Sequence, residues 1–310
     1  MKQLTIGIFH DDSLAEELGK KSTESDMILY HRKLDDYIFS FIHPVDDKLT
    51  VKTQILGIID VAILSAETIT PSFGETMLMI DALQLKYGFI IVPPFSDTST
   101  IKEMIKDTSL EHFEIIERDV HKIMEKLQEI QVDRNHELSA IVTIDHSFPV
   151  KGIGEVVLGF TKQGTIHTHD KLILLPTKKE IIVRSIQMQD KDEKEAPAGS
   201  RVGLAIKGAH VDELTRGSLL CKPESAQVEQ NISIHFLKNK FYPTVEKGKF
   251  HVTIGMQTIP ITITDIAENT LSFSADKPFC FTKDDLFLLL NLNAEKLHFI
   301  GSGKQMEKKT

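Results

Sequence analysis

The sequence of 310 residues has no tryptophan and only two cysteines, Cys221 and Cys280, which stand far apart without the spacing of metal ligands. This cysteine usage is typical of a reduced compartment, and we expect a cytoplasmic protein. No apolar run reaches the length of a membrane span, so we expect no membrane association. A net charge of −9 argues against nucleic-acid binding through bulk positive charge, and we expect no DNA partner.

The pattern of apolar residues divides the chain into an α/β part and an all-β part. Short buried-strand patterns alternate with helical patterns up to residue 133, which predicts a doubly wound, mostly parallel sheet covered on both faces. After a polar linker the pattern is all strand, and Pro223 to Gln227 separates two barrel-like halves. We therefore predict three domains, which comprise residues 1–133, 137–225 and 226–303.

Five glycine-rich or basic motifs follow one another within about eighty residues of the second predicted domain. They stand at Val150–Gly159, Gly164–Ile166, Val183–Gln187, Ala198–Gly203 and Arg216–Gly217. In type and order they resemble the second domain of the translational GTPases, elongation factor Tu and, more closely, the selenocysteine-specific elongation factor. The resemblance implies an α/β GTPase-like domain followed by two β-barrel domains.

A phosphate-binding loop of this family has the form GxxxxGK followed by Ser or Thr, because backbone N–H groups, a lysine and a hydroxyl together hold the phosphates and Mg²⁺. Here the first strand runs into Gly7-Ile8-Phe9-His10 and then Asp11-Asp12, with no lysine. Two carboxylates where phosphates would lie repel them. The position therefore predicts a lost phosphate site.

The other nucleotide motifs are absent as well. The Asp-x-x-Gly that orients Mg²⁺ is replaced by Ile42-His43-Pro44-Val45-Asp46, and the guanine-reading Asn-Lys-x-Asp is replaced at Pro93 and Pro94. We predict a pseudo-GTPase, which binds no nucleotide, needs no cofactor and is not an enzyme.

In the family, a surface pocket of the second domain receives the aminoacyl end of tRNA. The resemblance places Asp145, His146 and Arg216 at this candidate aminoacyl or RNA pocket. A guanidinium suits a carboxylate or selenolate, and a carboxylate suits an α-ammonium group. Histidine makes no bidentate fork and is mostly neutral at cytoplasmic pH. An equally open interpretation is that Asp145 and Arg216 form a salt bridge at a corner of the barrel.

Two further groups of residues have weaker functional interpretations. His167 and His169 share one face of a strand, but surface histidines are more common than metal ligands, and we predict no metal site. Four lysines of the third domain would form an RNA-facing patch if they cluster: Lys238, Lys240, Lys247 and Lys249.

These patterns predict an elongation factor-like protein that binds tRNA, or another translation-related or ribosome-associated RNA, through its barrels without hydrolysing GTP. Ribosomal or translation-factor proteins are further expected partners. One alternative is an atypical GTP-binding elongation factor. The other is a protein-binding regulator that competes with an authentic factor.

Overall fold

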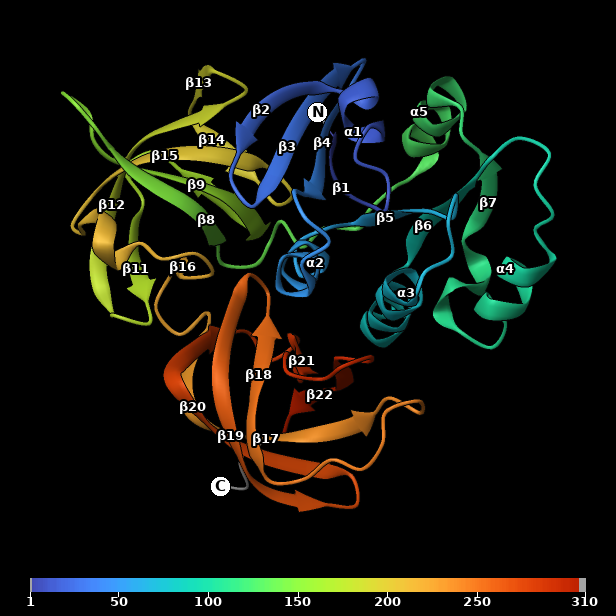
Figure 1. The fold of residues 1–310 in the computed structure, drawn as a ribbon. Coiled ribbons are helices and arrows are strands. Elements are labelled where there is room, and N and C mark those ends of the chain that lie inside the picture. The colour runs from blue at the N-terminus through green and yellow to red at the C-terminus, as the bar shows by residue number, and fades with distance from the viewer. Residues whose placement is uncertain (1, 307–310) are drawn as a thin grey trace. The chain divides into compact units, whose positions relative to one another are not determined.

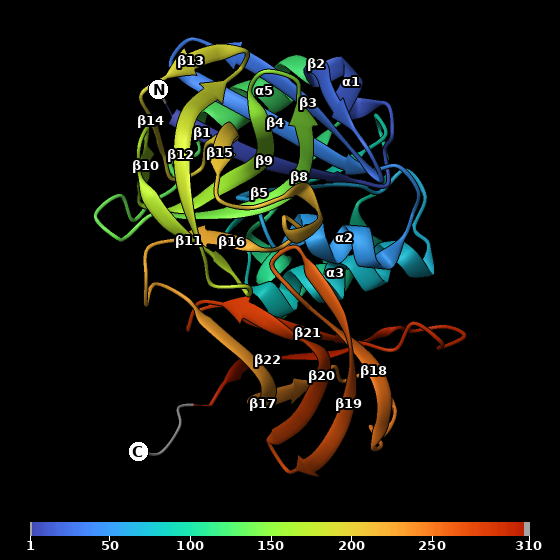
Figure 2. The same ribbon diagram turned by 90° about the vertical axis from the view of Figure 1, so that its left-hand side faces the viewer.

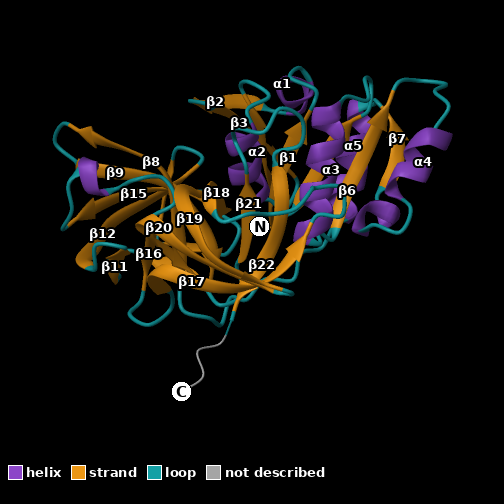
Figure 3. Cartoon of the chain, turned by 60° about the horizontal axis from the view of Figure 1, so that its bottom comes forward, coloured by secondary structure: helices purple, strands orange, loops and turns teal. Residues whose placement is uncertain are grey.

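A computed structural model describes residues 2–306, and the chain forms two compact units. Unit 1 comprises Met1–Asp133 together with Asn293–Ile300, and unit 2 comprises Arg134–Leu292 together with Gly301–Thr310. Helices are concentrated in unit 1, whereas unit 2 consists almost entirely of strands and loops (Figure 3). No helix in the described residues is long and apolar enough to cross a membrane.

Unit 1 contains a seven-stranded sheet in the order β2-β3-β4-β1-β5-β6-β7. The pairs from β4 through β1, β5 and β6 to β7 are parallel, and β2, β3 and β4 are antiparallel neighbours. The exposed polar strand β2 was not predicted from the sequence, since it has no apolar face. The strands are β1 (Lys2–Phe9), β2 (Lys20–Glu24), β3 (Met27–Leu34), β4 (Tyr37–Pro44), β5 (Val61–Ser65), β6 (Tyr87–Val92) and β7 (Glu114–Glu117).

Helices cover both faces of this sheet (Figure 1). Side chains alternate between the faces of a strand, so Leu4, Ile6 and Ile8 of β1 share one face, where they pack in a buried cluster with residues of α1 and α5. The opposite face carries α2 and α3. The helices are α1 (Leu14–Leu18), α2 (Leu49–Leu56), α3 (Pro71–Leu83), α4 (Ser99–Ile105), the 3₁₀ helix η1 (Ser109–His112) and α5 (Val120–Glu129).

The first barrel of unit 2 closes because β11 pairs with both β12 and β16. Around the barrel the order is β11-β16-β8-β9-β15-β12, and β8, β9 and β15 lie side by side (Figure 2). Its elements are β8 (Ile141–Val150), β9 (Gly154–Gln163), β10 (Thr165–His167), β11 (Lys171–Leu175), β12 (Lys179–Met188), β13 (Lys191–Glu193), β14 (Glu195–Pro197), β15 (Arg201–Lys207), the 3₁₀ helix η2 (Val211–Glu213) and β16 (Leu219–Cys221).

The second barrel is closed in the order β17-β20-β19-β18-β21-β22. Phe273, Phe279 and Phe287 meet edge to face in its core, with ring centroids 6.0 to 6.3 Å apart. The strands are β17 (Gln227–Lys238), β18 (Gly248–Ile254), β19 (Gln257–Ala267), β20 (Thr270–Phe281), β21 (Leu286–Leu290) and β22 (Phe299–Gln305).

The two cysteines, one from each barrel, lie in one buried apolar cluster of unit 2. Both thiols are free, and burial raises the pKa of Cys221 to about 11. They therefore behave as apolar core residues. The predicted fold class, a mostly parallel α/β domain followed by two β-barrels, is confirmed.

Candidate functional site

The turn after β1 carries an internal anion, the carboxylate of Asp11. This side chain is 7% exposed, and its Oδ1 accepts hydrogen bonds from the backbone N–H groups of Ser13 (3.1 Å) and Leu14 (3.0 Å). Those N–H groups open α1, which is the position where a phosphate-binding loop turns its N–H groups toward its ligand. The N–H groups are thus satisfied by the protein itself.

Arg118, which follows β7, holds Asp11 in place. Its Nε donates to Asp11 Oδ2 at 2.9 Å, and its Nη2 donates to Glu17 Oε1 at 2.8 Å. Burial by itself would raise the pKa of Asp11, but the hydrogen bonds from Arg118 and Ser13 outweigh burial and lower it. Asp11 is therefore a stable carboxylate at neutral pH.

The other positions named for the nucleotide site each have a local structural setting. Gly7 lies within β1, where an added Cβ would meet the Ile59 side chain at 2.8 Å, so its role is close packing. Asp12 is exposed beside the turn. Pro93 and Pro94 follow β6 and lead to Phe95, which is 99% exposed at a φ of 62°.

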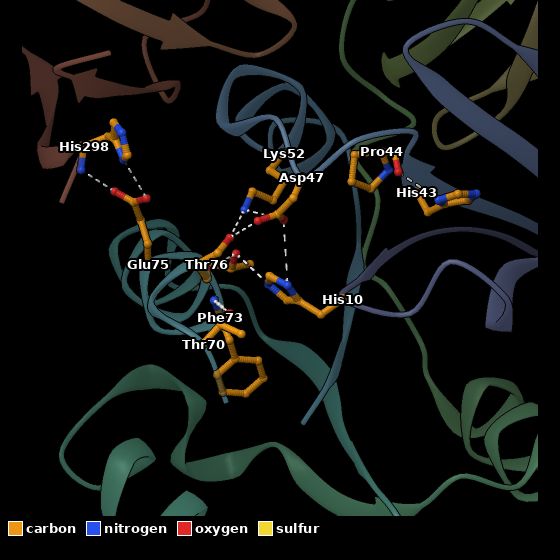
Figure 4. Close-up of polar contacts among 11 residues, drawn as sticks. His10, His43, Pro44, Asp47, Lys52, Thr70, Phe73, Glu75, Thr76 and His298 are labelled. Carbon is orange, nitrogen blue, oxygen red and sulfur yellow. Dashed lines mark hydrogen bonds and ion pairs between the residues drawn. The ribbon is translucent and has the colours of Figure 1, made fainter. Parts of the chain in front are cut away.

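A second polar cluster lies near the carboxyl ends of β1 and β4 in unit 1 (Figure 4). The Nζ of Lys52, whose side chain is 1% exposed, donates to Asp47 Oδ1 at 2.8 Å and to Ser72 Oγ at 2.5 Å. The Ser72 hydroxyl donates to the other carboxylate oxygen of Asp47. His10 is hydrogen-bonded through Nε2 to Thr76 Oγ1 at 3.0 Å, and its Nδ1 lies 3.8 Å from Asp47. The sequence pattern did not indicate this cluster, since its members come from four separate segments.

Glu75 of α3 binds the segment 293–300 within unit 1 (Figure 4). One carboxylate oxygen of this buried side chain accepts hydrogen bonds from the backbone N–H groups of His298 (2.6 Å) and Phe299 (2.7 Å). The other oxygen lies 3.2 Å from Nδ1 of the His298 ring. Two backbone donors and a ring nitrogen therefore fix the segment on α3.

In the first barrel, Asp145 is the centre of a charged cluster. The register of β8 against β9 shifts between Ile144 and His146, and at this bulge the Asp145 side chain is only 5% exposed. Its Oδ2 accepts a hydrogen bond from Arg201 Nη2 at 2.7 Å. Arg216 donates from Nε to the Asp145 carbonyl at 3.2 Å, and the same Nε lies 3.5 Å from Oδ1. Two guanidinium groups thus face one buried carboxylate.

Arg201 is the member of this cluster that the sequence analysis did not name. It opens β15 and lies over the Phe160 ring, with its guanidinium carbon 4.6 Å from the ring centroid. Among the described residues, the buried atoms Arg201 Nη1 and Asp145 Oδ1 have no hydrogen-bond partner. The sequence did contain a signal for Arg201, namely the arginine within the Ala198–Gly203 motif. In the structure, β15 pairs directly with β9 and places Arg201 opposite Phe160.

His146 lies apart from these charges. It is exposed, and its ring is 6.0 Å from that of Phe148. The contacts of the described residues join Asp145 to Arg201 and Arg216 but not to His146.

The remaining predicted residues make local contacts. His167 lies 3.3 Å from Glu195 and 3.8 Å from Asp170. Within residues 2–306, no three His, Cys, Asp or Glu side chains gather so as to hold a metal ion. Lys238 donates to the Tyr242 carbonyl, Lys247 pairs with Asp265 at 3.1 Å, and the Lys240 ammonium lies 5.0 Å from the centroid of the Phe241 ring.

Comparison with known sequences shows similarity to translation factors. The family model of elongation factor Tu domain 2 matches residues 154–221. An uncharacterized protein of Methanocaldococcus jannaschii, MJ0325, is 35% identical over 98% of this chain and 100% of its own length. The selenocysteine-specific elongation factor of the same organism is 27% identical over 85% of this chain, which matches 66% of that factor.

Solved structures share the fold of this chain. The elongation factor SelB of Methanococcus maripaludis, in complex with the GTP analogue GPPNHP, matches 100% of this chain with 80% of its own, at 23% identity and a TM-score of 0.85. A bacterial selenocysteine-specific elongation factor matches 100% of this chain with 60% of its own, at 18% identity and a TM-score of 0.82. The chain belongs to one family with MJ0325 and is similar to the translational GTPases, in particular to the selenocysteine-specific elongation factors.

Proposed function

We propose that this chain is an elongation factor-like protein of translation that binds the aminoacyl end of a tRNA, or another translation-related RNA, in its first barrel and does not use GTP. The observation that carries the RNA-binding part is the cluster of Asp145, Arg201 and Arg216. Arg201 Nη1 and Asp145 Oδ1 are buried and make no hydrogen bond among the described residues, although Arg216 Nε lies 3.5 Å from Oδ1. A guanidinium and a carboxylate in this state are suited to a ligand that brings both an anionic and an ammonium group.

The loss of GTP is supported by the carboxylate of Asp11. It takes the N–H groups at the start of α1, and Arg118 neutralises it. A nucleotide phosphate would have to displace a hydrogen-bonded carboxylate, and no lysine stands in this turn to stabilise the exchange. The factor would therefore engage its RNA without a nucleotide-dependent switch, because only a ligand that binds two states differently shifts their populations.

Crosslinking of the protein to RNA in cells, followed by sequencing, tests the assignment. We expect tRNA or ribosomal RNA to be enriched, with crosslinks in the first barrel. An Arg216→Ala variant should bind the recovered RNA about 1–3 kcal/mol more weakly, as for the loss of one charge-assisted contact. Arg184→Ala, which removes an exposed arginine of β12 outside the cluster, is the matched control. If no translation-related RNA is recovered, or if both variants bind like the unaltered protein, the assignment is wrong.

A further inference from the structure

The cluster around Lys52 in unit 1 has the composition of an anion site that is already filled. Lys52 lies on α2 with a side chain that is 1% exposed, so its ammonium is held inside the protein. Burying an ammonium is costly unless hydrogen-bonded anions or dipoles replace its water. Here one carboxylate and one hydroxyl replace it, those of Asp47 and Ser72.

The anion is the accessible partner of this pair. The Asp47 side chain is 56% exposed and stands on the short connection between β4 and α2. Its two oxygens accept hydrogen bonds from the Lys52 ammonium and the Ser72 hydroxyl, which belong to α2 and α3. The two donors stand on helices and the acceptor stands on a connecting segment, so a movement of that segment would take Asp47 away while the donors stay.

We propose that Lys52, Ser72 and His10 form a binding site for a phosphate-like oxyanion, and that the carboxylate of Asp47 occupies this site as an internal ligand. The site is distinct from the Asp11 turn and uses no backbone N–H group of that turn. A lysine ammonium and a hydroxyl donate to this carboxylate, and the imidazole beside it becomes a third donor when it is protonated. Together these are donors that a phosphoryl group takes.

The hydrogen bonds fix the state of His10. The single Thr76 hydroxyl hydrogen goes to the Ser72 carbonyl at 2.9 Å, so His10 Nε2 is the donor in its contact with Thr76 Oγ1. Burial and the charge of Lys52 lower the pKa of His10, and they outweigh Asp47 and Asp12, which raise it. The ring is therefore neutral at neutral pH. Because Nε2 carries the hydrogen, Nδ1 presents a lone pair toward Asp47. An incoming dianion would favour the protonated ring, which then donates from Nδ1. Anion binding should therefore be tighter at pH 6 than at pH 8.

An internal ligand weakens binding of an external one, since only the fraction of molecules with Asp47 displaced can accept it. Removal of the carboxylate should expose the site. We therefore expect the Asp47→Ala variant of the full chain to bind inorganic phosphate about tenfold or more tightly than the unaltered protein. Its melting temperature should be lower than that of the unaltered protein in chloride and should recover in phosphate at matched ionic strength.

Three variants complete the experiment. Asp46→Ala removes the neighbouring exposed carboxylate and should respond to phosphate like the unaltered protein. Asp47→Ala with Lys52→Met should lose the phosphate response, because the cation is gone. Asp47→Asn removes the charge with little change of shape and replaces Asp47→Ala if the latter does not fold.

The readouts are phosphate titrations by calorimetry and melting temperatures in phosphate against chloride, at pH 6 and pH 8. If phosphate changes the melting temperatures of all variants equally, it acts as a general salt and not at this site, and the proposal is overturned. It is also overturned if the folded Asp47 variant, whether Asp47→Ala or Asp47→Asn, binds no more phosphate than the unaltered protein. Neither outcome touches the RNA-binding assignment, which does not involve this cluster.

Discussion

Arg201 Nη2 lies 2.7 Å from Asp145 Oδ2, on a carboxylate that is only 5% exposed. Arg216 approaches the same carboxylate less closely, at 3.5 Å. The two arginines thus differ in how closely they contact the buried carboxylate. Arg201 compensates a buried charge, whereas Arg216 adds a longer contact that a ligand can replace.

Replacement of Arg201 should therefore destabilise the protein more than replacement of Arg216. Arg201→Met leaves Asp145 buried without its closest cation, and we expect the free energy of unfolding to fall by about 3–5 kcal/mol. For Arg216→Ala we expect about 1 kcal/mol. Urea unfolding of the two variants measures the difference. Equal losses would show that the salt bridge to Arg216 is as structural as that to Arg201.

The unaltered protein should not bind GTP or GDP in calorimetric titrations with Mg²⁺ present. A phosphate clamp normally contributes several kcal/mol, and here its N–H groups are taken by Asp11. Micromolar affinity would instead establish the alternative of an atypical GTP-binding factor.

Asp11→Ala should lower the free energy of unfolding by about 1–2 kcal/mol, because the two N–H groups at the start of α1 lose their acceptor. The exposed neighbour provides the matched control, and Asp12→Ala should change stability by less than about 0.5 kcal/mol. The variant should still fail to bind GTP, because no lysine takes the place of the lost carboxylate. If the two variants have the same stability, Asp11 does not cap the helix.

His10 should make stability depend on pH. Burial is the main reason why its folded-state pKa lies below the 6.5 of an ordinary histidine. Between those two pKa values the unfolded chain binds more protons than the folded one, so stability rises with pH and is lost as pH falls below about 6.5. His10→Asn, which tolerates the φ of 64° at this position, should flatten the dependence.

Urea unfolding between about pH 5 and about pH 8 tests this, with His121→Asn as an exposed control. An unchanged slope in His10→Asn would assign the dependence to another group.

Glu75→Ala should release the segment 293–300 locally. The backbone N–H groups of His298 and Phe299 lose the carboxylate that accepts them at 2.6 and 2.7 Å. Hydrogen exchange of these two amides should become faster, while amides in β1 keep their protection. Unchanged exchange at both positions would mean that other contacts hold the segment.

The sequence alone determined the class of fold. Alternating apolar segments in the first 133 residues predicted a covered parallel sheet, and the glycine and arginine motifs between residues 150 and 217 resembled one barrel family. These signals are local, because a strand or a tight turn is specified by residues that are neighbours in the chain. The absence of a lysine after Gly7 was equally visible in the sequence.

Only the tertiary structure decided which charges meet. Asp145 and Arg201 are 56 positions apart, and Asp11 and Arg118 are 107 apart, so no spacing rule connects them. His146, next to Asp145 in sequence, lies outside the cluster, since a bulge buries one side chain and exposes the next. Lys52 and Asp47 are only five positions apart, and what the structure adds is that Lys52 is buried while Asp47 is exposed. Burial and long-range pairing are properties of the packed chain, and they decide whether a carboxylate is a surface charge or an internal ligand.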